Sequence, residues 1–80
     1  MAKRARTPKT ILQHRKLIGD AIRSFRKDAQ LTQEGLAERA ELNPKYLGEL
    51  ERGEKIISIE ALMRIAKVVK VPVHEFLRGI

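Results

Sequence analysis

The stretch Leu31–Gly53 constrains this chain most, because it carries the start and stop signals of two short helices with almost nothing between them. Thr32 is a good N-cap, and Asn43 followed by Pro44 is a second start signal, since a missing N–H costs nothing in a first turn. Gly53 is a typical stop. The apolar residues that recur at helical spacing inside the stretch are Leu36, Ala37, Ala40, Leu47 and Leu50. We therefore expect two helices, over about residues 33–40 and 44–52, joined by a tight turn.

The remainder of the chain shows the same helical period. Before the stretch, Thr10 is placed to cap a helix whose firm part covers about residues 17–27, with Gly19 weakening its first half. After it, Ser58 is placed to cap a fourth helix, and Pro72 begins a short fifth one. Core candidates outside the central stretch are Ile11, Ile18, Ala21, Ile22, Phe25, Leu62, Ile65, Ala66 and Val69. No stretch alternates as a strand does, so the sequence predicts an all-α, compact five-helix domain over residues 10–80.

Positive charge is concentrated at the N-terminal end. Residues 1–27 hold nine Lys or Arg and one acid, whereas the whole chain carries a net charge of +7. Residues 1–9 form a polar, basic arm with nothing to bury, which predicts disorder. Such an arm suits a polyanion such as DNA, because Lys and Arg release condensed counterions from phosphates, and an arm can enter a minor groove. The alternative is a solubilising tail.

Several functional classes have no support in the sequence. The chain has no cysteine, and His14 and His74 are too far apart for metal-ligand spacing. No phosphate-binding glycine loop, nucleophile motif or apolar run of about 20 residues is present. We therefore expect a protein that is not an enzyme, without metal, cofactor or membrane span, located in the cytoplasm and on the nucleoid when DNA-bound. We also expect no small-molecule ligand, because a single 80-residue domain leaves no room for a second, ligand-binding one.

The central motif resembles a known family. Thr32-Gln33-x-x-Leu36-Ala37, followed by Asn43-Pro44-x-Tyr46-Leu47-Gly48-x-Leu50-Glu51-Arg52-Gly53, is similar to the Xre/Cro–lambda-repressor helix-turn-helix proteins, over about residues 15–78. The stretch 45–59 also resembles the stand-alone controllers of restriction–modification systems. The resemblance implies a lambda-repressor-like fold whose recognition helix, about 44–52, enters the DNA major groove.

The resemblance also assigns DNA contacts. The positions are Thr32, Gln33, Lys45, Tyr46, Gly48, Glu49, Arg52 and Lys55. Lys45 would read guanine acceptors and Glu49 a cytosine amino group. Gln33 would bind a phosphate and brace the recognition helix, while Arg52 and Lys55 would contact further phosphates. Tyr46 is expected at the groove wall.

The resemblance assigns scaffold roles too, and the chain departs from the family pattern at several places. Arg26 and Glu51 match a partly buried salt bridge between the first helix and the recognition helix. Pro44 replaces a polar, base-contacting residue, and Gly48 weakens its helix while permitting closer approach to DNA. Glu41 stands where glycine is usual, which predicts a left-handed backbone at a non-glycine residue.

Two functions from different classes fit these features. The first is a transcription regulator that binds a two-fold-symmetric operator as a homodimer, because symmetric half-sites double the few contacts of one recognition helix. The expected dimer interface is Val73, Phe76, Leu77 and Ile80, although the first three alternatively close the core. The second is a protein-interaction module, such as an antitoxin or a co-activator, that uses the same fold to bind a partner protein.

Overall fold

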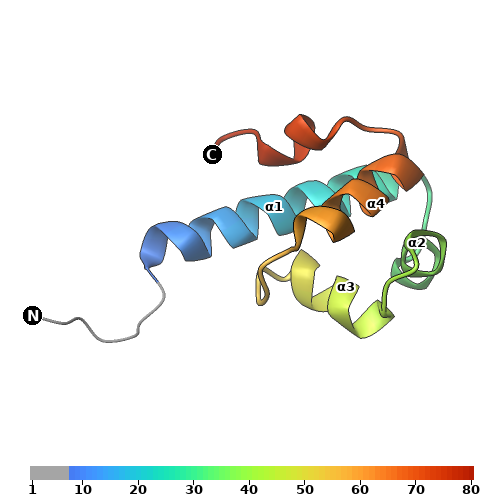
Figure 1. Cartoon of the computed structure of the whole chain (residues 1–80), viewed down its shortest axis with the longest axis horizontal. Helices are drawn as coiled ribbons and strands as arrows, with labels where there is room; N and C mark the ends of the chain where they lie inside the picture. The colour runs from blue at the N-terminus through green and yellow to red at the C-terminus, as the bar shows by residue number, and fades with distance from the viewer. Residues whose placement is uncertain (1–7) are drawn as a thin grey trace, which may run out of the picture.

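The computed structural model describes residues 8–80 as a small helical bundle (Figure 1). Its elements are α1 (Lys9–Asp28), α2 (Gln33–Ala40), α3 (Pro44–Glu51), α4 (Ile59–Val69) and the 3-10 helix η1 (Val73–Leu77). The all-α prediction is confirmed, with the difference that the fifth helix is a short 3-10 turn. Within this described range, no helix is long and apolar enough to cross a membrane.

Three of the expected helix starts form as the local chemistry predicts. The side-chain oxygens of Thr32, Asn43 and Ser58 each accept a hydrogen bond from a first-turn backbone N–H, at 2.9, 2.7 and 3.0 Å. A cap of this kind stabilises a helix by about 1 kcal/mol. The turn between α2 and α3 also follows the expectation, because Glu41 adopts the left-handed conformation with φ of 58°.

The start of α1 differs from the prediction. The helix begins at Lys9, after Pro8, and no side chain caps it, so Thr10 lies inside the helix and is not its cap. Lys9, the last residue of the expected arm, belongs to this helix. Residues 1–7 of that arm lie outside the described residues, so their disorder stays a prediction.

The core holds the two central helices against α1 and α4. α1 packs on α3 and on η1, while α2 packs on α4 and on α3. In Figure 1, α3 lies below α1 and the C-terminal segment lies above it. The largest fully buried side chains are Ile22, Leu36, Leu47, Ile65 and Phe76. One side chain from each of the five elements thus meets in a single core, which fixes the position of α3.

The position of Phe76 decides between its two expected roles, a dimer contact and a core residue. Its side chain is 1% exposed, and its ring packs edge-on against Phe25 of α1 with centroids 4.9 Å apart. Phe76 therefore closes the core and is not available to a second copy. Val73 is half-buried against the same core, whereas Leu77 and Ile80 are 38% and 53% exposed.

The packing of α1 against α3 explains why position 19 is a glycine, which the sequence alone did not show. A Cβ atom at this position would lie 2.4 Å from the carbonyl oxygen of Leu50 and 2.7 Å from that of Glu51. The C-terminal end of α3 therefore crosses α1 directly at the glycine. Glycine lowers the helix propensity of α1, but only a residue without a Cβ atom allows the two helices to cross this closely.

Candidate nucleic-acid interface

A buried ion pair fixes α3 relative to α1. Arg26 donates from Nε and Nη2 to the two carboxylate oxygens of Glu51, at 2.7 and 3.0 Å, and from Nη1 to the Leu31 carbonyl, at 2.9 Å. The two residues are 9% and 5% exposed. The hydrogen bond to Glu51 raises the pKa of Arg26, although burial alone would lower it. The Arg26–Glu51 pair that the resemblance implies is thus present, and it also holds the segment that leads into α2.

Gln33 joins the same network from the first turn of α2. Its Nε2 donates to Glu51 Oε1 at 2.9 Å. A side-chain amide has two N–H donors, so this bond leaves one for a phosphate oxygen. The Thr32 hydroxyl oxygen accepts from the Gly35 N–H in the cap, and its own O–H is not used in that bond. The N-terminus of α2 therefore presents one free amide donor, held in place from α3, beside a positive helix end.

Two of the predicted base-reading side chains lie one turn apart on α3. Lys45 is exposed at the second position of the helix, and Glu49, four residues later, is half-buried. Residues at i and i+4 lie on the same side of a helix, about 6 Å apart. A lysine suits the acceptors of guanine, and a glutamate suits the amino group of cytosine.

Gly48 does not lie on the outward surface, contrary to the expectation of closer approach to DNA. It is buried, and a Cβ atom there would meet Arg52 Nη1 at 3.2 Å and Gln33 Oε1 at 3.6 Å. The side chains of Gln33 and Arg52 cover this glycine. Its missing side chain makes room for two groups that the resemblance assigns to phosphates.

Tyr46 points toward the start of α4. Its ring is half-buried against the core, and its hydroxyl accepts a hydrogen bond from the Ser58 backbone N–H at 3.4 Å. The side chain therefore braces α3 against the α3–α4 connection, and only the part of the ring outside the core is available to a partner.

Arg52 has an acidic partner that the sequence reading missed. It donates from Nε and Nη2 to the carboxylate of Glu54, at 2.8 and 3.2 Å, and both side chains are more than half exposed. This hydrogen bonding raises the pKa of Arg52 and lowers that of Glu54. An acid two residues after a predicted phosphate contact was the available signal. Lys55, the next residue, is exposed.

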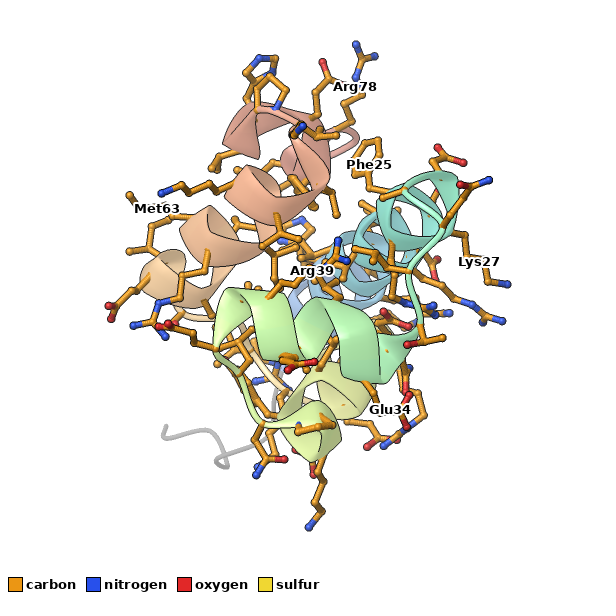
Figure 2. The ribbon with its side chains drawn as sticks, turned by 90° about the vertical axis from the view of Figure 1, so that its right-hand side faces the viewer. Phe25, Lys27, Glu34, Arg39, Met63 and Arg78 are labelled. Carbon is orange, nitrogen blue, oxygen red and sulfur yellow. The ribbon has the colours of Figure 1, made fainter. Side chains whose placement is uncertain are left out.

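These residues form one surface around α3. Gln33 comes from α2, Lys45 and Glu49 from α3, and Arg52 and Lys55 from the turn that follows. In Figure 2, α2 lies in front of α3, with Glu34 near the end of α2 that lies closer to α1 and Lys27 projecting from α1 on the same side. The surface joins two helix N-termini with basic side chains, an arrangement that suits a phosphate backbone on either side of a groove.

Known proteins resemble this chain in sequence and in fold. The helix-turn-helix family HTH_3 matches residues 22–76. The control protein C.SmaI of Serratia marcescens is 32% identical over 63 residues, which are 79% of this chain and 75% of that protein.

Solved structures agree in fold. The clp gene regulator ClgR from Corynebacterium glutamicum has a TM-score of 0.78 at 40% identity, covering 88% of this chain and 72% of that one. SinR, a master regulator for biofilm formation solved in complex with DNA, has a TM-score of 0.73 at 34% identity, covering 75% and 97% of the two chains. The chain therefore belongs to the helix-turn-helix family of the Xre/Cro type, a family of DNA-binding transcription regulators.

Proposed function

We propose that this chain regulates transcription by binding a two-fold-symmetric operator as a homodimer, with α3 in the major groove. The observation that carries the proposal is the network centred on Glu51, which holds the Gln33 amide beside α3. A partner-facing helix fixed in this way is preorganised, so little ordering is needed on binding. Such a regulator acts in the cytoplasm, on the nucleoid.

Each predicted contact residue has a distinct part in the proposal. Lys45 and Glu49 read base edges, so they determine which operator is bound. Gln33, Arg52 and Lys55 contact phosphates, so they determine how tightly any DNA is bound and at which register. Thr32 contributes to DNA binding by capping the start of α2. Gly48 makes room for the side chains of Gln33 and Arg52, and Tyr46 braces α3 against the start of α4.

Selection from random duplexes, followed by titrations of the recovered site, tests this separation of base-reading residues from phosphate-contacting residues. Lys45→Ala should change the preferred bases at one position of each half-site and lower affinity for the selected site by about 1–3 kcal/mol. Arg52→Ala should weaken selected and random duplexes alike and reduce the slope of log affinity against log salt by about 0.9. Lys67→Ala, an exposed lysine on α4, is the matched control and should change neither property.

Two results would contradict the proposal. If no duplex is bound above the affinity for random DNA, the chain does not read an operator. Salt-independent binding to a co-purified protein, with no retardation of DNA, would favour the protein-interaction function instead.

The homodimer rests on the exposed apolar residues that remain after Phe76 is assigned to the core. We place the contact at Leu77 and Ile80, which lie at the C-terminal end. Ile80→Asp should convert the dimer to a monomer in sedimentation equilibrium without loss of helix content. Met63→Asp is the control, because Met63 is a similarly exposed apolar residue on α4. Dissociation by the Met63 variant alone would move the interface to α4.

A further inference from the structure

A partly open groove lies between the N-terminal half of α1 and the segment that follows α3. Its cavity volume is about 150 Å³. The aliphatic side chains that line it are Ile11, Ile18, Leu50, Ile56 and Ile57. Ile11 and Ile56 are 37% and 66% exposed, so the rim of the groove is apolar surface in contact with water. Covering such surface is favourable by the hydrophobic effect.

The remaining lining side chains are basic. They are His14 and Arg15 on α1 and Lys55 after α3, and among residues 8–80 no carboxylate lines the groove. Arg15 Nε is buried without a hydrogen-bond partner in the part of the chain that the structure describes. Because Arg15 Nε has no accessible area, an occupant of the groove would meet the guanidinium at its other nitrogens, and the positive charges of Arg15 and Lys55 favour a negatively charged occupant.

We propose that this groove binds a small aliphatic monocarboxylate. The hydrocarbon chain lies along the five aliphatic side chains, and the carboxylate accepts hydrogen bonds from Arg15 and Lys55. A cavity of about 150 Å³ holds a group of roughly six carbon atoms, as in an engineered apolar cavity of that size that binds benzene. Pentanoate and hexanoate therefore match the groove in length, and a neutral or cationic chain of the same length lacks the complementary charge.

The groove shares one residue with the DNA-binding surface. Lys55 lines the groove and is also one of the proposed phosphate contacts. A carboxylate that occupies Lys55 competes with a phosphate for the same ammonium group. Bound ligand therefore weakens operator binding and reduces the salt slope by about 0.9. This consequence rests on the proposed function, whereas binding of the carboxylate to the free chain does not.

The site is tested by titrating the free chain with sodium butanoate, pentanoate and hexanoate. Binding is monitored by ¹H–¹⁵N NMR. Saturable shifts are expected at Arg15 and at residues 55–57. Affinity should rise about fourfold with each added CH₂ group until the groove is filled. Hexan-1-ol and hexylammonium should bind at least tenfold more weakly than hexanoate, because neither satisfies the basic rim.

Variants separate the charge from the apolar wall. Arg15→Met should lower hexanoate affinity at least tenfold, whereas Arg23→Met, which changes an exposed arginine of α1 outside the groove, should leave it unchanged. Ile56→Asn is a second test that does not depend on the fold of α1, because Ile56 is an exposed loop residue, and it too should weaken binding.

The absence of saturable shifts with hexanoate overturns the proposal. So does binding of hexan-1-ol with the affinity of hexanoate, or binding that Arg15→Met leaves unchanged in a folded variant. Operator titrations with hexanoate or with sodium chloride at equal ionic strength test the link to DNA separately. Equal operator affinity in the two salts, despite saturable hexanoate binding, overturns that link alone.

Discussion

Replacing Gly19 by alanine tests whether the crossing of α1 and α3 controls the stability of the domain. An alanine in a helix interior is favoured over glycine by about 1 kcal/mol, so propensity alone predicts a more stable protein. The new Cβ, however, would lie 2.4 and 2.7 Å from two backbone carbonyl oxygens of α3, against ordinary contacts of 3.4 Å or more. Because backbone atoms cannot rotate away, the end of α3 must retreat by about 1 Å.

The expected net effect is destabilisation by about 2 kcal/mol. Overpacking of a close-packed site costs about 1–3 kcal/mol, and this site belongs at the upper end because a retreat of α3 also strains the bonds between Arg26 and Glu51. Subtracting the propensity gain leaves about 2 kcal/mol, or a decrease in Tm of about 8–16 °C for a domain of this size. Thermal and urea unfolding, followed by circular dichroism, measure both quantities.

Gly35→Ala is the matched control, since Gly35 also lies inside a helix. A Cβ there would meet only side-chain atoms, the nearest being Thr32 Oγ1 at 3.2 Å, a tight contact that a small shift of this side chain relieves. This variant should be more stable than the wild type by up to about 1 kcal/mol. If Gly19→Ala raises stability as Gly35→Ala does, the close crossing is not a constraint and the reasoning is refuted.

Three further substitutions probe the interface. Glu51→Gln leaves Arg26 buried without a counter-charge and should destabilise the domain by about 3 kcal/mol in urea unfolding; a loss below about 1 kcal/mol would mean that the pair is dispensable. Glu54→Gln frees Arg52 for phosphate, so affinity for any duplex and the steepness of its salt dependence should both increase; unchanged binding would show that Arg52 does not contact DNA. Tyr46→Phe removes only a 3.4 Å hydrogen bond, so the free energy of unfolding should fall by less than about 1 kcal/mol with the preferred operator unchanged; a changed preference would place the hydroxyl at the bases.

The sequence alone determined the helices and where three of them begin. Thr32, Asn43 and Ser58 cap groups two or three residues away, so the evidence for each start is contained in a short window of the chain. Capping hydrogen bonds depend on chain neighbours only, and a sequence states those directly. The left-handed backbone of Glu41 follows instead from the family resemblance, because glycine is usual at that position of the turn.

The positions that the sequence misjudges or leaves open depend on residues far apart in the chain. The sequence predicts that Gly19 weakens its helix, although α3 crosses it about thirty residues later. It leaves Phe76 open between a dimer interface and the core, and packing against Phe25 decides for the core. It predicts that Gly48 lets DNA approach closely, although side chains from α2 and the end of α3 lie over it. Spacing shows which residues share a face of a helix, but it does not show which other helix that face meets. Only the packed bundle decides that, because close packing joins elements regardless of their separation in sequence.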